Sequence, residues 1–417
     1  MGKRVVITGV GAVTPLGNDV NSTWSGLLAG RSGIAGITLF DPAAFSVRIF
    51  GELKGFDPSL YIDAKELRRM DRNVQYAVAA AKQAVDDAGL VIDEASRDET
   101  GVVVGTAIGG IKTLLDNQKV LEERGPNRMS PHFLHNLIPD TASGQVAIST
   151  GARGPNHAVV SACATGGHAL GEAAETIRRG DAHTMLAGGT EACLVPLVLA
   201  GFITMRALAA GNGDPAKACR PFDKNRSGFV MAEGCCMMVL EDLEHALARG
   251  AEIYAEFAGY GSSNDAFHLA APADEGEGAA RAMKMALRKA SIAPQEVDYI
   301  NAHGTGTALN DKVETAAIKT VFGDHAYELA VSSTKSMTGH MMGAAGAVEA
   351  LSCVLAIKHG AIAPTVNYET PDPECDLDYV PNVARETPVR VAISNSMGLG
   401  GHNSCVVFRR YEGQTAN

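Results

Sequence analysis

Short apolar runs rich in β-branched residues alternate along the chain with longer segments of helical periodicity. The apolar runs lie at residues 5–7, 102–104, 159–161 and 299–301. The longest periodic segment spans about residues 64–88 and is followed by Gly89. Further helices are predicted at residues 164–179, 241–249, 277–290, 311–321 and 340–358. This alternation is typical of an α/β protein whose helices cover both faces of its sheets.

One short motif occurs twice at a long separation. The pattern G-H-x-x-G stands at residues 167–171 and again at residues 339–343, each time before a helical segment that stops at a glycine, Gly180 or Gly360. A repeat at this distance indicates two duplicated halves rather than a solenoid, whose period is about 20 to 50 residues. A single match of five residues in a glycine-rich chain is also compatible with chance.

Composition limits the class of protein and its partners. The 417 residues exceed one ordinary domain, and 46% hydrophobic with 20% charged residues excludes a disordered chain. The net charge of −11 gives no general electrostatic attraction to nucleic acid or to an anionic membrane, and neither partner is predicted. An acidic partner therefore needs a local basic patch.

The chain carries no sign of export, of a membrane span or of a metal site. It has no long uninterrupted apolar stretch and no signal pattern, and its eight cysteines form no C-x-x-C pair, so the cytoplasm is the predicted compartment. The pattern Gly9-Val10-Gly11 is not a dinucleotide-binding loop, because Thr14 and Pro15 interrupt the expected motif and helix. His132 and His135 lack a third ligand at metal-like spacing.

Four residues stand where chemistry is expected. Cys163 follows an apolar run and opens a predicted helix, where free N–H groups favour a thiolate. His303 precedes Gly304-Thr305-Gly306-Thr307 at the end of a strand, while Lys335 and His340 flank a second polar turn. The alternatives are a buried structural cysteine, a turn or core histidine, and a solvated lysine paired with an exposed Glu349.

Taken together, these segments resemble the elongating β-ketoacyl-acyl-carrier-protein synthases, most closely the type II enzyme of dissociated fatty-acid synthesis. The resemblance covers essentially the whole chain. It is carried by residues 5–17, the turn around Cys163, Cys219-Arg220-Pro221-Phe222-Asp223, residues 303–307 and residues 334–346.

The resemblance implies a fold and an assembly. The fold would be α/β and thiolase-like, with two duplicated βαβαβαββ halves in a five-layered αβαβα arrangement. The halves would be residues 1–250, which carry the nucleophilic cysteine, and residues 251–417, which carry the two histidines. Together they would form one ketosynthase domain spanning about residues 3–411, and the protein would be a homodimer.

The resemblance also implies an acyltransferase mechanism without a cofactor, because the substrates arrive on the phosphopantetheine arm of acyl carrier protein. Cys163 would take an acyl chain and lose it to a carbanion made by decarboxylating malonyl-carrier, which extends the chain by two carbons. His303 and His340 would donate hydrogen bonds to the enolate. Lys335, paired with Glu349, would keep both histidines neutral. The backbone N–H groups of Cys163 and Leu399 would form the oxyanion hole.

Other positions are implied for substrate and carrier. Thr305 and Thr307 would bind the pantetheine arm, and Ile108 and Phe202 would line the acyl pocket. The family usually has two phenylalanines in the loop where this chain has Met397 and Leu399, so we expect a looser gate to the acyl pocket. The carrier would dock on a basic patch, whose alternative is a solvated helix face: Lys65, Arg68, Arg69, Arg128 and Arg206.

Two alternative functions stay open. A ketosynthase of type II polyketide or another specialised pathway would use the same chemistry. A non-catalytic subunit of the chain-length-factor kind would lack the nucleophile, whereas Cys163, His303, His340 and Lys335 are all present. Chain length, saturation, carrier identity and bound ions are not determined by the sequence. A monovalent cation near Asn301 and Asn395 would serve such a fold as structural support.

Overall fold

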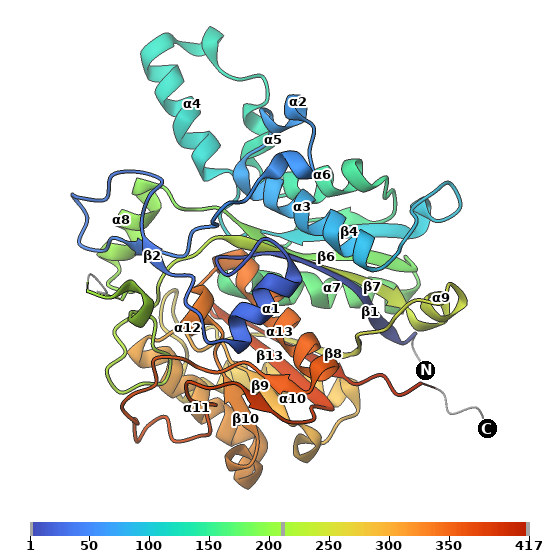
Figure 1. Ribbon diagram of the computed structural model, residues 1–417, viewed down its shortest axis with the longest axis vertical. Helices are drawn as coiled ribbons and strands as arrows, with labels where there is room; N and C mark the ends of the chain where they lie inside the picture. The colour runs from blue at the N-terminus through green and yellow to red at the C-terminus, as the bar shows by residue number, and fades with distance from the viewer. Residues whose placement is uncertain (1–2, 210–212, 414–417) are drawn as a thin grey trace.

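The computed structural model describes residues 3–209 and 213–413. Ten strands form one mixed sheet that crosses the molecule (Figure 1). In spatial order they are β10 (Ala330–Ser332), β9 (Tyr299–Asn301), β13 (Val391–Gly398), β14 (His402–Arg409), β8 (Ala255–Asn264), β1 (Val5–Val13), β7 (Gly234–Asp242), β6 (Thr184–Glu191), β4 (Thr100–Gly105) and β5 (Asn156–His157). Two short sheets accompany it, β2 (Ala35–Gly36) with β3 (Ile49–Phe50), and β11 (Ala361–Ile362) with β12 (Arg385–Glu386).

The two ends of the large sheet follow the same pairing scheme. β4 lies parallel to β5 and β6, and β7 runs antiparallel to both β6 and β1. On the other side β9 lies parallel to β10 and β13, and β14 runs antiparallel to both β13 and β8. The two sets meet where β1 and β8 share two residue pairs, Val6 with Glu256 and Ile7 with Ala255.

The helices cover the sheet from several sides. α3 packs on β1 and β7, α10 packs on β8 and β14, and α7 and α13 contact each other in the middle of the molecule (Figure 1). All but two residues of α13 are buried, which explains its nearly uniform apolar sequence. The long helices are α3 (Arg72–Asp87), α4 (Ile111–Arg124), α6 (Thr141–Thr150), α7 (Thr165–Arg179), α10 (Glu277–Ala290), α11 (Ala308–Phe322) and α13 (Ala345–His359). The shorter helices are α1 (Val20–Leu28), α2 (Ala64–Leu67), α5 (Phe133–Leu137), α8 (Pro196–Thr204), α9 (Leu243–Ala248) and α12 (Lys335–Thr338).

Gly9 and Gly11 serve close packing of a helix on a strand. Both lie within β1, and a Cβ atom on them would approach the carbonyl oxygens of Ala84 and Ala80 in α3 to 2.2 and 2.0 Å. Only glycine allows the helix to lie this close. The Gly9-Val10-Gly11 pattern is therefore part of a buried strand and is not a dinucleotide-binding loop.

Three predicted elements differ from the structure. The helix expected at residues 64–88 is broken into α2 and α3, because Asp71 adopts an extended backbone and its carboxylate accepts hydrogen bonds from the backbone and hydroxyl of Thr113. The strand expected at residues 159–161 is absent, since β5 ends at His157 and Val160 is exposed. The predicted helix at residues 340–358 begins only at Ala345, after the 3₁₀ turn Met342–Ala344.

The internal repeat also has a different register from the one that the motif suggested. The 3₁₀ turn Ala162–Ala164 leads into α7, and the 3₁₀ turn Met342–Ala344 leads into α13. Ala162 and Met342 share a positive φ, of 50° and 46°. Cys163 therefore corresponds to Gly343, whereas an alignment of the two G-H-x-x-G motifs would match it with Lys335.

One helical stretch, residues 342–359, is long and apolar enough to cross a membrane, but 89% of it is buried inside the protein. That burial is typical of the core helix of a globular fold.

Candidate active site

Cys163 lies at the turn before α7 and is partly exposed. The positive φ of Ala162 bends the backbone at this point, and Ser161 closes the turn by donating its N–H to Thr165 Oγ1 at 2.8 Å. Backbone strain of this kind persists only where the surrounding structure holds it, and it is common at functional sites. The turn presents the Cys163 side chain to a pocket rather than to the core.

The Cys163 thiol is neutral in this structure. Burial raises its pKa to about 11, although the ammonium of Lys335 and a hydrogen bond from the N–H of Leu399 lower it. The thiolate expected from the helix N-terminus is therefore outweighed by desolvation. The same geometry brings the Leu399 N–H next to the sulfur, and a Cβ on Gly398 would lie 3.1 Å from the Cys163 nitrogen.

His303 follows β9 and is held through its backbone. Its N–H donates to Glu314 Oε1 at 2.7 Å, and the N–H of Gly304 donates to Glu314 Oε2 at 2.8 Å. Glu314 lies on α11, and burial raises its pKa to about 7. One carboxylate thus fixes the turn that carries the imidazole. Glu314 was not predicted from the sequence. Its only signal there is an acidic residue on the buried face of the helix after the H-G-T-G-T motif.

Asp311 is a second missed carboxylate on the same helix. It accepts hydrogen bonds from the N–H of Phe222 at 2.8 Å and from the N–H of Gly306 at 3.1 Å. These bonds tie the segment of residues 219–223 to the turn of residues 303–307. The family motif at Phe222 is therefore a support of the pocket wall and does not line the pocket itself.

Lys335 begins α12 and is almost completely buried, with 1% of its side chain exposed. Its ammonium donates to the carbonyl oxygen of His303 at 2.6 Å, lies 3.4 Å from His303 Nδ1 and forms an ion pair with Glu349. Burial raises the pKa of Glu349, while Lys335 lowers it. The alternative of a solvated lysine with an exposed partner is wrong.

His340 lies beside His303. The two rings are 5.4 Å apart at an angle of 86°, and the His340 ring meets Phe229 edge to face at 5.2 Å. Its backbone N–H donates to the carbonyl oxygen of Val230 at 2.7 Å. The Nδ1 atom of His340 is buried without a hydrogen-bond partner among the described residues.

Both histidines are neutral. Burial lowers the pKa of His303 well below its ordinary value, and the charge of Lys335 lowers it further. Burial and Lys335 act in the same direction on the pKa of His340. A cation beside two imidazoles disfavours a second positive charge, which is the effect predicted for Lys335. Each neutral ring can therefore donate an N–H hydrogen bond without carrying the acidic proton of an imidazolium.

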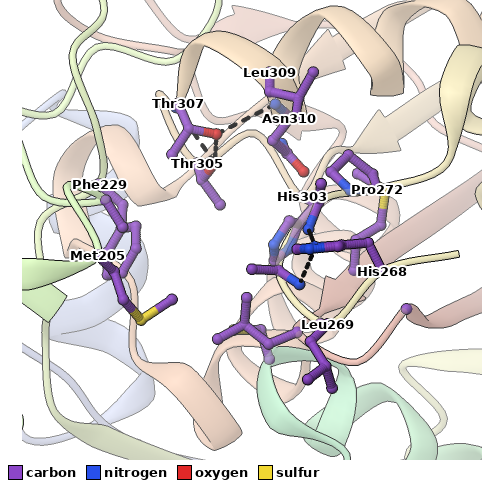
Figure 2. Close-up of a pocket in the computed structure, with 18 of the residues that line it drawn as sticks. Met205, Phe229, His268, Leu269, Pro272, His303, Thr305, Thr307, Leu309 and Asn310 are labelled. Atoms are coloured by element: carbon purple, nitrogen blue, oxygen red, sulfur yellow. Dashed lines mark hydrogen bonds between the residues drawn. The ribbon is translucent and has the colours of Figure 1, made fainter. Parts of the chain in front are cut away.

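A pocket of about 420 Å³ joins these groups. Figure 2 shows Met205 and Phe229 on one wall, with His268 and Leu269 on the wall opposite. The loop of residues 265–272, which the sequence analysis missed, supplies that second wall, and Leu269 accepts a hydrogen bond from the N–H of Gly400 at 2.8 Å. Predicted site residues that line the pocket are Cys163, Phe202, Arg206, His303, Thr305, Thr307, His340, Met397 and Leu399.

The two threonines lie at one edge of the pocket (Figure 2). Their hydroxyls are 3.1 Å apart, and Thr307 Oγ1 accepts a hydrogen bond from the N–H of Asn310 at the start of α11. Ile108 does not line this pocket, but it packs with Cys163 and Phe202 against one hydrophobic cluster. Of the two predicted acyl-pocket residues, Phe202 therefore lines the pocket, and Ile108 lies outside it beside the same cluster.

The predicted docking residues fall into two regions. Arg206 is exposed at the pocket. The other four are exposed around α2, α4 and α5, which Figure 1 shows away from α8, the helix before Arg206. Only Lys65 belongs to α2, and Arg69 pairs with Glu66 at 3.1 Å. A single chain thus presents one cation at the pocket and a separate basic region: Lys65, Arg68, Arg69 and Arg128.

Three buried oxygen atoms in or beside the core strands have no hydrogen-bond partner in the described part of the chain. Asn301 Oδ1, Asn395 Oδ1 and Ser394 Oγ are buried in this way, and Ser394 pairs with Asn301 across β13 and β9. Amide and hydroxyl oxygens suit a hard monovalent cation, so these residues could hold one as a support. Among the described residues there is no group of three histidine, cysteine or acidic side chains able to bind a metal ion.

Comparisons with known proteins agree with this arrangement. The model of the β-ketoacyl synthase N-terminal domain matches residues 2–246, and that of the C-terminal domain matches residues 254–369. The 3-oxoacyl-[acyl-carrier-protein] synthase 2 of Synechocystis is 52% identical over 98% of this chain and 99% of its own. The corresponding protein of Staphylococcus aureus is 53% identical over the same shares.

Solved structures agree as well. A β-ketoacyl synthase from Burkholderia phymatum matches with a TM-score of 0.91 and 36% identity, over 98% of this chain and all of that one. A type II polyketide ketosynthase bound to its acyl-carrier protein matches with a TM-score of 0.91 and 36% identity, over 99% of this chain and all of that one.

The chain therefore belongs to the β-ketoacyl synthase family and is an acyltransferase with a thiolase-like mixed α/β fold. Within that family it falls with the type II 3-oxoacyl-[acyl-carrier-protein] synthases, the elongating condensing enzymes of fatty-acid synthesis. The resemblance found in the sequence is confirmed.

Proposed function

We propose that the chain elongates acyl groups on acyl carrier protein with Cys163 as nucleophile. The thiol attacks the acyl thioester of the carrier, and the thiol of the phosphopantetheine arm leaves with the proton, so the exchange conserves charge. Because the Cys163 thiol is neutral at rest, its proton must pass to the leaving sulfur of the phosphopantetheine arm as the thioester is exchanged. The tetrahedral oxyanion would accept hydrogen bonds from the N–H groups of Cys163 and Leu399.

The second stage begins with malonyl-carrier. Loss of carbon dioxide leaves an enolate, whose oxygen would accept hydrogen bonds from His303 and His340. The carbanion attacks the thioester on Cys163, and the product is a 3-oxoacyl carrier that is two carbons longer. One observation carries the proposal. Both neutral imidazoles and the cysteine line one pocket, and the Lys335 ammonium donates a hydrogen bond to the carbonyl oxygen of His303. Neutral rings stabilise the enolate without protonating its carbon.

Substrate groups would be held along the same pocket. Thr305 and Thr307 face it with free hydroxyl capacity for the pantetheine arm. The acyl chain would extend from Cys163 toward Phe202 and Ile108. Met397 and Leu399 stand where the family usually has phenylalanines, and Leu399 is 40% exposed at the pocket. We propose that these smaller or more flexible side chains form a looser gate.

The partner that this chemistry requires is an acidic carrier protein. A similar polyketide ketosynthase has been solved in complex with its acyl-carrier protein, which supports the proposal for this chain. Arg206 is the predicted docking cation that lines the same pocket as Cys163. The basic region formed by Lys65, Arg68, Arg69 and Arg128 would complete the docking surface if a second copy of the chain supplies that region.

A homodimer would supply that second copy. β5 ends the large sheet with its outer edge unpaired, and apolar side chains near it are exposed. Ile148 is 76% exposed and Leu134 is 63% exposed, and Ile138 and Val160 are also exposed. An unpaired strand edge flanked by exposed apolar residues favours pairing with a second chain.

The five-layered arrangement stays a prediction, with residues 1–250 and 251–417 as two halves of one domain that spans about residues 3–411. The matching strand orders of the two halves and the contact between α7 and α13 support it.

Two further predictions stay open. The cytoplasm is supported by eight cysteines that are all free thiols, as expected in a reducing compartment. A specialised polyketide pathway is the second candidate function, because solved ketosynthases of such systems are 36% to 40% identical to this chain. The higher identity to fatty-acid enzymes favours the first candidate.

The test is the intact mass of the protein after incubation with acyl-carriers of graded length, followed by malonyl-carrier. We expect wild type to gain one acyl mass, Cys163→Ala to gain none, and the chase to release a saturated-chain 3-oxo product two carbons longer. Extension of carriers that retain several keto groups, without extension of saturated ones, would favour the polyketide pathway. Failure of every carrier to acylate Cys163 would contradict both.

A further inference from the structure

Glu191 is a buried carboxylate outside the set of residues that the mechanism uses. It ends β6, its side chain is fully buried, and no salt bridge involves it among the described residues. It does not line the pocket. A buried charge without a cation is retained only where hydrogen bonds satisfy its oxygens, so the partners of Glu191 are informative.

The carboxylate joins two turns that come from different parts of the chain. Glu191 Oε1 accepts a hydrogen bond from Thr106 Oγ1 at 3.0 Å. Glu191 Oε2 accepts from the N–H of Ala107 at 2.8 Å and from the N–H of Gly343 at 3.1 Å. Thr106 and Ala107 belong to the turn after β4, and Gly343 belongs to the turn that follows His340. One side chain therefore sets the separation of these turns.

The backbone segments around the Glu191 carboxylate are packed so closely that no additional atom fits between them. A Cβ on Gly343 would lie 2.5 Å from the Ala107 nitrogen, and a Cβ on Gly189 in β6 would lie 2.4 Å from the Gly343 oxygen. A Cβ on Gly166, near the start of α7, would lie 3.1 Å from that oxygen. The helix that follows Cys163 therefore touches the same turn that Glu191 holds.

Each of these turns carries a residue of the proposed site. The turn after β4 carries Ile108, which packs with Cys163 against one hydrophobic cluster. The 3₁₀ turn that contains Gly343 begins two residues after His340, and α7 begins two residues after Cys163. We propose that Glu191 is a positioning residue that fixes the cysteine, the His340 turn and the Ile108 turn relative to one another. This inference rests on the proposed roles of Cys163 and His340.

The contacts depend on the shape of the group more than on its charge. Burial raises the pKa of Glu191 to about 7, although the N–H groups of Ala107 and Gly343 lower it. A glutamine can accept from the two N–H groups through its oxygen and donate its amide to Thr106 Oγ1, so Glu191→Gln keeps all three bonds. Glu191→Leu keeps much of the volume but leaves two buried N–H groups without an acceptor.

A charge effect on the nucleophile is separable from this geometry. Glu191 raises the pKa of the Cys163 thiol, alongside Glu349, while Lys335 lowers it. The other titratable group near Glu191 is the thiol of Cys193, whose pKa Glu191 also raises. Glu191→Gln should therefore leave positioning intact and make alkylation of Cys163 faster at a given pH.

The experiment compares acylation of Cys163 in three variants by intact mass, at a single turnover, with short and long acyl-carriers. We expect Glu191→Gln to acylate within about threefold of wild type and Glu191→Leu to lose about a hundredfold in rate, since misplacement by about 1 Å has that effect. The concentration of carrier that gives half the maximal rate should stay unchanged, because the docking surface is untouched. Thr190→Val is the matched control, as it removes a buried hydrogen bond from the neighbouring residue of β6 to the Asn73 carbonyl.

Thr106→Val covers the case in which Glu191→Leu fails to fold. It removes one of the three bonds and should slow acylation by about tenfold. Equal rates for wild type, Glu191→Leu and Thr106→Val, or an equal loss in Thr190→Val, would overturn the proposal. If wild type itself gains no acyl mass, the failure lies in the proposed role of Cys163 and not in Glu191.

Discussion

The ammonium of Lys335 donates to the backbone carbonyl of His303 at 2.6 Å and lies 3.4 Å from the Nδ1 atom of the same residue. A positive charge at this distance opposes protonation of the imidazole, and burial opposes it further. The relationship explains how two histidines in one pocket stay neutral near physiological pH, where an exposed histidine is partly charged.

Lys335→Met removes this charge, and we expect the pKa of His303 and of His340 to rise toward its ordinary value. A higher pKa means that more imidazolium forms as the pH falls. An imidazolium can protonate the carbanion, so the variant should convert more malonyl-carrier into acetyl-carrier as the pH falls from about 8 to 6. Mass analysis of the products measures this ratio.

The variant also leaves Glu349 buried without its partner. Lys335→Met with Glu349→Gln removes both charges and serves as the control for that loss. If the double variant restores the product ratio of wild type at low pH, the charge of Lys335 on the histidines is not the cause.

The raised pKa of Cys163 predicts a slow reaction with iodoacetamide at neutral pH. Since the pKa is about 11, the thiolate fraction and the alkylation rate should rise about tenfold per pH unit between about pH 7 and 10. Lys335 lowers this pKa, so Lys335→Met should alkylate more slowly at every pH. Cys163→Ala is the control, because the other seven cysteines are buried. A plateau of the rate near pH 7 would contradict the neutral thiol.

Leu399→Phe tests the looser gate at the pocket. Leu399 is 40% exposed, so the larger ring should leave the free energy of unfolding nearly unchanged. We expect the turnover of long acyl chains to fall several-fold relative to short ones. Leu309→Phe makes the same substitution at another pocket residue, which is 49% exposed. It should leave the dependence of turnover on acyl chain length unchanged. An unchanged chain-length profile in Leu399→Phe would exclude a gate at this residue.

Arg206→Glu tests carrier docking. Because the side chain is exposed at the pocket mouth, we expect KM for acyl-carrier to rise about threefold to tenfold with kcat nearly constant, and the effect to shrink at high salt. Arg153→Glu changes an exposed arginine that pairs with Asp98 outside the pocket and serves as the control. Equal KM values for the two variants would remove Arg206 from the docking surface.

The unpaired edge of β5 predicts the oligomeric state. Ile148→Lys should place a charge in the interface of a homodimer and shift the mass measured by sedimentation from two chains to one at micromolar concentration. Val91→Lys is the control, since Val91 is 73% exposed and Ile148 is 76% exposed. A wild-type protein that sediments as a single chain would contradict the dimer before any variant is made.

Local patterns in the sequence were enough to single out three residues that the structure brings to one pocket. Cys163, His303 and His340 each stand in a glycine-rich turn beside a strand or helix, and glycines there reflect close backbone approaches that leave a visible signature. The alternation of strands and helices likewise predicted an α/β fold. These signals are short-range, so they survive in one chain without an alignment.

The remaining features depended on contacts between distant segments. The break between α2 and α3 follows from Asp71 bonding to Thr113, and the register of the repeat became visible only when the turns before α7 and α13 could be compared. The pKa of Cys163 also departs from the local expectation, because desolvation comes from every segment packed around the thiol.

Sequence by itself determined the family and singled out Cys163, His303 and His340 as candidates, since their motifs are local and specific. Only the tertiary structure decided that Glu314 holds the His303 turn and that Glu191 joins the turns around Cys163. An acidic residue in a helix or at a strand end has no pattern that distinguishes a solvated carboxylate from a buried one. Its role depends on which backbone N–H groups the fold brings to it.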